Sequence, residues 1–158
     1  MSRFLLALTL VSARRMARGR AANADLEAAV RDAYVDKHQV HHGSITVDGE
    51  AVEFSEAGPK DAAKTVLFCH GAALSMTTWQ HVGVLDALAE RGMRAIALNL
   101  PGYGASSKTI GGWQGKAGFI RRVVEALDLP STLMIVAASM GGSYALPFVM
   151  DPGPSKVA

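Results

Sequence analysis

Three short apolar segments, each followed by a stretch with helical spacing, constrain the fold of this chain more than any other feature. They cover residues 65–69, 95–100 and 133–138, and each ends at a glycine, proline or serine turn. Such a run is typical of a strand that is buried on both faces. Strands that alternate with helices form a parallel sheet with right-handed crossovers. The sequence therefore predicts an α/β fold, with a mostly parallel sheet and helices on both faces.

A β-hairpin is expected before these segments. Residues 44–47 and 51–54 alternate between apolar and polar side chains around Asp48-Gly49. This dipeptide supplies the positive φ angles that a two-residue turn requires. The sheet should therefore begin with an antiparallel pair.

Three helices are expected between and after the buried strands. Ser75 can cap a helix that runs to about Arg91 and ends at Gly92. Apolar residues recur at helical spacing over 119–127, and residues 143–150 can form a further helix. The first helix would carry its apolar side chains on one side, namely Trp79, Val82, Leu85 and Leu88.

The first 24 residues differ in composition from the rest of the chain. They contain no acidic residue, and they carry arginines at positions 3, 14, 15, 18 and 20. Their apolar run, residues 4–11, is shorter than the about 20 residues that span a bilayer. A secretory segment, a mitochondrial transit peptide and a plain basic terminus or misassigned start all fit this pattern. We expect a leader over residues 1–24, a linker over 25–39 and a folded domain over 40–158.

Charge and cysteine content exclude several classes of protein. The net charge is +2, and the basic excess lies in the leader, so no nucleic-acid-binding face is expected. Cys69 is the only cysteine, which excludes an internal disulfide. Its place at the end of an apolar strand predicts a buried, inert thiol.

No cofactor or metal site is expected from the remaining motifs. His38 and His42 would share a face if their segment were helical, and His41 lies beside them. No carboxylate or cysteine completes a metal site there, so a solvated linker is favoured. Gly102-x-Gly104 lacks the full dinucleotide fingerprint.

The chemistry concentrates at Ser139, which follows the third apolar strand and precedes a helix. Strand, tight turn and helix form the context of a nucleophile elbow, in which the serine hydroxyl is exposed above the sheet. Small residues are needed two positions before and after the serine, and Ala137 and Gly141 occupy these positions. The alternative is a structural serine at a strand–helix turn, because short motifs also match by chance.

A second motif, His70-Gly71-Ala72, follows the first buried strand. In a fold with a nucleophile elbow, this loop supplies one backbone N–H of an oxyanion hole, and the residue after the nucleophile supplies the other. Ala72 and Met140 would be these donors, stabilising negative charge on a carbonyl oxygen. His70 is expected to position the loop rather than to act as a base.

These segments together resemble the α/β-hydrolase superfamily. The stretches that carry the resemblance are Val-Leu-Phe-Cys-His-Gly at 66–71, Thr-Trp-Gln at 78–80 and Leu-Asn-Leu-Pro-Gly-Tyr-Gly-Ala-Ser at 98–106. Residues 139–148 are similar to the α/β-hydrolase domain-containing protein 14 branch. The resemblance covers about residues 43–152. It implies an eight-stranded sheet and a cytoplasmic serine hydrolase that acts on small acyl esters or related acyl donors.

The match to the family pattern is incomplete after Ser139. In this fold the nucleophile is followed along the chain by an acid and then by a histidine. No histidine follows Ser139 in the sequence, and Asp151, which we interpret as a helix-end or loop carboxylate, is the only later acid. We therefore expect an N-terminal part of the fold that is inactive by itself. The alternative is an inactive isoform or gene fragment that acts, if at all, by binding.

An incomplete sheet has a structural consequence for residues 133–138. We expect this apolar strand to form an open edge, at which another protein or a second copy could pair. The helix behind it would expose Leu146 and Phe148.

Overall fold

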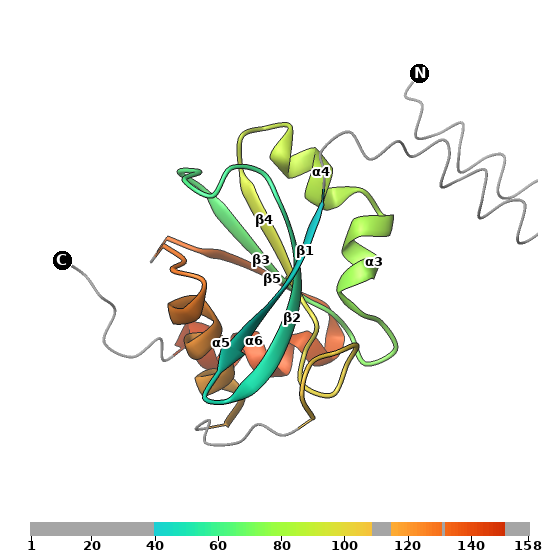
Figure 1. Cartoon of the computed structure of the whole chain (residues 1–158), viewed down its shortest axis with the longest axis vertical. Coiled ribbons are helices and arrows are strands. Elements are labelled where there is room, and N and C mark those ends of the chain that lie inside the picture. The colour runs from blue at the N-terminus through green and yellow to red at the C-terminus, as the bar shows by residue number, and fades with distance from the viewer. Residues whose placement is uncertain (1–39, 109–114, 131, 151–158) are drawn as a thin grey trace, which may run out of the picture. The chain divides into compact units, whose positions relative to one another are not determined.

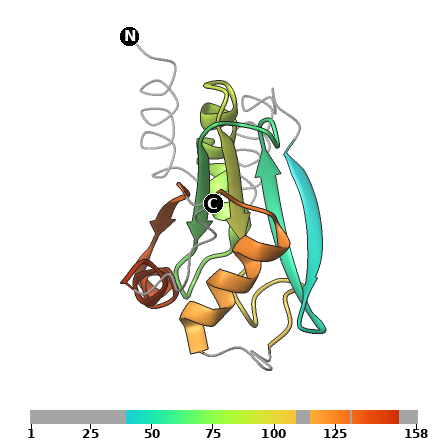
Figure 2. The ribbon, with the colours of Figure 1, turned by 90° about the vertical axis from the view of Figure 1, so that its left-hand side faces the viewer.

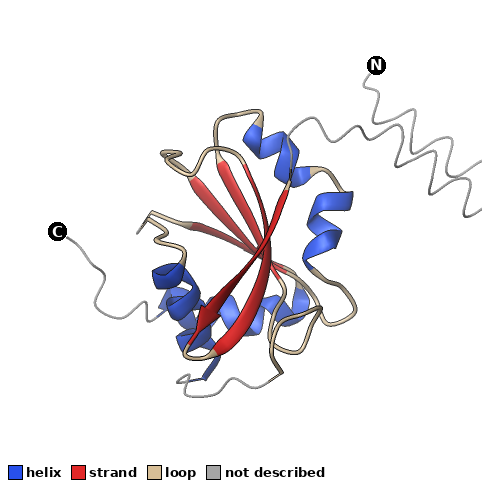
Figure 3. Cartoon of the chain, in the orientation of Figure 1, coloured by secondary structure: helices blue, strands red, loops and turns tan. Residues whose placement is uncertain are grey.

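The computed structural model describes residues 40–108, 115–130 and 132–150. The expected leader and linker lie outside the described residues. Within them, five strands form one sheet in the order β1-β2-β4-β3-β5 (Figures 1 and 3). The strands are β1 (His41–Val47), β2 (Glu50–Ala57), β3 (Thr65–Cys69), β4 (Arg94–Leu98) and β5 (Met134–Ala137).

The predicted hairpin is confirmed. Strands β1 and β2 pair antiparallel, and Val47 lies opposite Glu50 across the turn. Asp48 and Gly49 have φ angles of 49° and 84°, the left-handed conformation that favours this dipeptide. Strand β2 also pairs antiparallel with β4, whereas β3 pairs parallel with β4 and with β5. The sheet is therefore mixed, with a leading antiparallel pair and a parallel part that carries the later turns.

The prediction of one helix from Ser75 to about Arg91 is wrong, because the chain forms two short helices instead. Helix α3 spans Met76–His81 and helix α4 spans Val84–Ala89. Gly83 lies between them with a φ of 76°, a left-handed conformation that stops α3 and changes the direction of the chain. Val82, expected on the buried side, is 57% exposed at this break.

Helices cover both faces of the sheet, as predicted (Figure 2). One face packs against α3 and α4 through a core that includes Phe68, Met76 and Leu85. The other face packs against helix α5 (Gly115–Ala126) and helix α6 (Gly142–Met150). Its core includes Leu67, Phe119, Ile120, Val123 and Tyr144. No helix in residues 40–108, 115–130 and 132–150 is long and apolar enough to cross a membrane.

The third apolar strand, β5, lies at the edge of the sheet. Within the described part of the chain it pairs with β3 alone. Met134 and Val136 are therefore 43% and 40% exposed, although their sequence pattern matches that of the buried strands. On α6, Leu146 is 63% exposed as expected, whereas Phe148 is half-buried against the core.

Candidate active site

Ser139 occupies a strained turn between β5 and α6. After Ala137 the chain enters a 3-10 turn, η1 (Ser139–Gly141), and continues directly into α6. Ser139 has a φ of 47°, a conformation that residues other than glycine rarely adopt. Such strain is of order 1–3 kcal/mol and is concentrated at functional sites. The serine is exposed, as a nucleophile held on an elbow must be.

Gly141 allows the elbow to approach the central strand. A Cβ at this position would lie 2.5 Å from the carbonyl oxygen of Cys69 and 2.9 Å from its Cβ. The amide of Ala138 donates to the same Cys69 oxygen at 3.0 Å, so β3 and the elbow are in direct contact. Ala137 lies opposite Cys69 in the parallel register and is exposed. The predicted need for a small residue two positions after Ser139 thus has a steric reason at Gly141. Two positions before Ser139, the methyl group of Ala137 is accommodated because this residue is exposed.

The loop after β3 reaches the elbow. A Cβ placed on Gly71 would lie 3.5 Å from the Cβ of Ser139, so this glycine borders the serine directly. Ala72 follows it, and within the described residues its amide makes no hydrogen bond to another residue. The predicted oxyanion residues Ala72 and Met140 thus lie next to Gly71 and Ser139 in the chain, at two loops that touch.

His70 is buried, and both of its ring nitrogens are engaged. The amide of Leu100 donates to Nε2 at 3.1 Å, and Nδ1 lies 2.8 Å from the carbonyl oxygen of Gly71. This pairing assigns the proton to Nδ1, which donates to Gly71. Burial lowers the pKa of His70, while the hydrogen bond to Gly71 opposes this shift. Its contacts are those of a residue that positions a loop.

Tyr103 is a site residue to which the sequence pattern gave no role. Its hydroxyl donates to the carbonyl oxygen of Ala72 at 2.8 Å and lies 3.6 Å from the sulfur of Met140. Its ring packs edge-to-face on His70, with centroids 4.6 Å apart. The Pro-Gly-Tyr-Gly turn after β4 was visible in the sequence, but these contacts bridge more than 30 residues.

The elbow backbone is held on a second side by α5 and α6. The hydroxyl of Ser143 donates to the carbonyl oxygen of Met140 at 2.6 Å. Lys116 donates to the Ser143 hydroxyl at 2.8 Å, and its ammonium group lies 5.0 Å from the centroid of the Tyr144 ring. The carbonyl groups of both candidate oxyanion residues therefore have hydrogen-bond partners.

A general base for Ser139 is not found among the described residues. No histidine or carboxylate in residues 40–108, 115–130 and 132–150 hydrogen-bonds to its hydroxyl. Asp151, expected to be a loop carboxylate, lies outside the described residues. The site therefore comprises a candidate nucleophile and candidate oxyanion donors.

The histidines near the N-terminus do not lie on a helix. His41 and His42 belong to strand β1, and His42 Nδ1 lies 3.0 Å from the hydroxyl of Ser55. His42 therefore cannot share a helix face with His38, because His42 lies on a strand. His38 itself lies outside the described residues. In the part of the chain that the structure describes, no three metal-ligating side chains cluster.

Cys69 is a buried thiol, as predicted. It is fully buried in the core, and burial raises its pKa to about 12. The neutral thiol is a weak nucleophile, because the thiolate is the reactive form.

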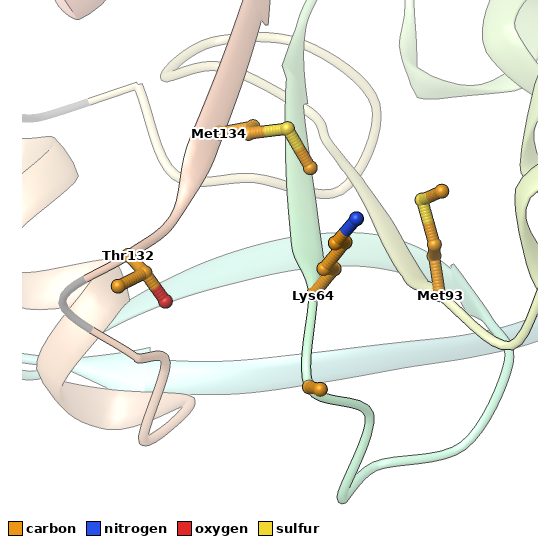
Figure 4. A pocket seen from close by; sticks show the side chains of 5 residues that line it. Lys64, Met93, Thr132 and Met134 are labelled. Carbon is orange, nitrogen blue, oxygen red and sulfur yellow. The ribbon is translucent and has the colours of Figure 1, made fainter.

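A hollow of about 440 Å³ lies away from Ser139, at the opposite ends of the strands. It is lined by Ala63, Lys64, Met93, Thr132 and Met134 (Figure 4). These residues precede or begin β3, β4 and β5, whereas Ser139 follows the carboxyl end of β5. Ligands of open α/β sheets bind outside the carboxyl ends of the strands. The hollow is therefore not part of the candidate site.

Comparison with known proteins agrees with this geometry. The family model described as alpha/beta hydrolase fold matches residues 64–158. ABHD14B of Rattus norvegicus, named a candidate protein-lysine deacylase, is 39% identical over 121 residues, which are 72% of this chain and 57% of that protein. ABHD14A of Mus musculus is 42% identical over 88 residues, which are 54% of this chain and 35% of that protein.

The structural comparison supports the same fold. A CIB-like hydrolase from Thermoplasma acidophilum superposes with a TM-score of 0.64 at 21% identity, covering 73% of this chain and 58% of that chain. Of the curated relatives that it matches, such as ABHD14B and ABHD14A, the chain spans about half the length or less. The family model matches more than half of the chain, and its region contains the elbow and the loop after β3. The chain therefore belongs to the α/β-hydrolase family and resembles its ABHD14 branch.

Proposed function

We propose that this chain supplies the nucleophile and the oxyanion hole of a serine hydrolase that cleaves or transfers small acyl groups. Ser139 is the nucleophile. The observation that carries the proposal is its positive φ of 47° at the end of β5, with Gly71 against its side chain. A turn that only connects a strand to a helix does not require this strain at a serine.

The proposed chemistry begins with attack of the Ser139 hydroxyl oxygen on an acyl carbonyl carbon. The carbonyl oxygen then takes on negative charge, which the backbone N–H groups of Ala72 and Met140 stabilise. Removing one such donor typically lowers kcat by about 10²–10³-fold. The Ala72 amide suits this role because no described residue occupies it. No cofactor is required for this reaction.

Proton transfer requires a histidine and an acid in addition. The proposal assigns them to later strand ends of the complete hydrolase domain, because the acid and then the histidine follow the nucleophile in this fold. Without a base the serine hydroxyl is a weak nucleophile. We therefore propose that residues 1–158 alone turn over little substrate, and that the cytoplasmic location implied by the family applies to the complete protein.

The acyl donor is proposed as an ester-type substrate. The name of ABHD14B adds acylated lysine, an amide, as a second donor to compare. Both donors proceed through a tetrahedral oxyanion, so the same two amides would serve either. Hydrolysis of an acetyl ester and of an acetyl-lysine peptide, measured side by side, distinguishes them.

The test begins with the transcript beyond the codon for Ala158. A transcript that encodes a later acid and histidine yields a longer protein, which is treated with a fluorophosphonate probe. We expect labelling that Ser139→Ala abolishes. Ser44→Ala is the matched control, because Ser44 is exposed on β1 and belongs to no part of the site.

Labelling that persists in Ser139→Ala would place the nucleophile elsewhere. A folded longer protein that never reacts, beside a known serine hydrolase that does, would contradict the proposal altogether. A transcript that stops after Ala158 would favour the alternative, an inactive isoform that acts by binding. The open edge of β5 is the surface that this alternative would use.

A further inference from the structure

We propose that Tyr103 is a positioning residue that couples the two sides of the oxyanion hole. This inference rests on the proposed function, because it concerns the backbone donors Ala72 and Met140. The tyrosine comes from the turn after β4, whereas the donors come from the turns after β3 and β5. One side chain therefore connects the turns at three strand ends.

The hydroxyl of Tyr103 has a defined partner on each side of the hole. It donates to the carbonyl oxygen of Ala72 at 2.8 Å, and the sulfur of Met140 lies 3.6 Å away. A thioether sulfur is a weak acceptor, so the hydrogen bond to Ala72 is the stronger of the two. That bond fixes the carbonyl group of Ala72 and thereby limits rotation of the peptide units on either side.

The ring of Tyr103 is itself held in place by His70. The two rings pack edge-to-face at 4.6 Å, and His70 is anchored to Leu100 and Gly71 through its two nitrogens. The carbonyl groups of Gly71 and Ala72 thus receive consecutive hydrogen bonds from His70 and Tyr103. This arrangement presents the Ala72 amide in a fixed direction before any substrate binds, which is the requirement for electrostatic preorganisation.

Tyr103→Phe removes the hydroxyl and retains the ring contact with His70. Tyr144→Phe is the matched control, because it removes a tyrosine hydroxyl that has no hydrogen-bond partner within the described residues. Backbone amide hydrogen exchange of Leu74 and Gly141 is measured in the chain of residues 1–158 for the wild type and both variants, because these amides donate to Gly71 and Ala138 and close the two turns. We expect Tyr103→Phe to raise exchange at both amides by roughly tenfold, the effect of losing about one hydrogen bond. Exchange at the β3 amides should not change.

Unchanged exchange at Leu74 and Gly141 in Tyr103→Phe would overturn the inference. A uniform rise across the sheet would overturn it too, because it would reveal a general structural role. These readouts do not depend on activity. A separate measurement uses a form of the protein that reacts, such as the longer protein. Acylation of Ser139 by p-nitrophenyl acetate is there followed by mass spectrometry of the intact protein.

In a reactive form we expect Tyr103→Phe to slow acylation by roughly tenfold without changing the ester concentration at half saturation, because the donors act on the transition state. Tyr144→Phe should acylate at the wild-type rate. A rise in the half-saturation concentration with an unchanged maximal rate would contradict the positioning role. A folded longer protein, with the later acid and histidine, that is never acylated would contradict the proposed function, and the exchange data would still decide the place of Tyr103.

Discussion

Replacing Gly141 by alanine is expected to destabilise the fold by about 1–3 kcal/mol, the usual cost of inserting a methyl group into a packed interior. The new Cβ would lie 2.5 Å from the oxygen and 2.9 Å from the carbonyl carbon of Cys69. These atoms belong to a strand that is paired on both sides, by β4 and by β5. The clash cannot be relieved by rotation of a side chain, so η1 or β3 must move.

Gly142 provides the control for this prediction, because it is the next residue in the chain and, unlike Gly141, has open space where a Cβ would lie. No atom lies within 4 Å of a Cβ built on Gly142, and its φ of −60° is helical. Gly142→Ala should therefore leave stability unchanged or raise it by about 0.4–1 kcal/mol. Urea unfolding followed by circular dichroism gives both free energies of unfolding. Equal stability of the two variants would refute the steric argument for the elbow.

Other predictions concern buried groups and the leader. The thiol of Cys69, whose pKa burial raises to about 12, should resist a thiol reagent at pH 8 in the folded chain and react after unfolding. Glu56→Ala should cost about 3–5 kcal/mol in urea unfolding, because it leaves the buried guanidinium of Arg94 unpaired, whereas loss of the exposed Lys60 should cost under about 1 kcal/mol. The lowered pKa of His70 means that the folded state binds this proton more weakly, so stability should fall as pH drops below 6.5. A urea midpoint that does not change between pH 7 and pH 5 would contradict this. Deleting residues 1–24 should cause no large loss of the helix signal in circular dichroism and should leave the melting temperature unchanged.

Local features of the fold were predictable from the sequence. The hairpin turn at Asp48-Gly49 follows from the backbone preferences of two residues, and β3 begins and ends where its apolar run does. The break between α3 and α4 was not predictable. Leu85 and Leu88 continue the helical spacing across Gly83, and a single glycine within such a pattern is compatible with an unbroken helix.

Burial and side-chain contacts between distant segments were harder to predict from the sequence. Residues 133–138 are as apolar as the strands beside them, and only the neighbours of β5 decide that Val136 is 40% exposed. Ser139, Ala72 and Met140 could be chosen as site residues because turns after parallel strands meet at one edge. The contact of Tyr103 with Ala72 depends on the path of the turn after β4, which no periodicity encodes.

The proposed acyl transfer has two requirements, namely a positioned nucleophile with oxyanion donors and a pair of proton-transfer groups. Strain at Ser139, the close approach at Gly141 and the contacts of Tyr103 are formed by β3, β4 and β5 with their following turns. These contacts can fix a nucleophile and backbone donors without a base. In a serine protease, loss of the whole triad leaves about 10³–10⁴-fold catalysis over water, attributed to the oxyanion hole and binding. By this reasoning, the proposed nucleophile and oxyanion donors are positioned by local contacts of β3, β4 and β5 with their following turns, and this positioning does not depend on the proposed proton-transfer groups.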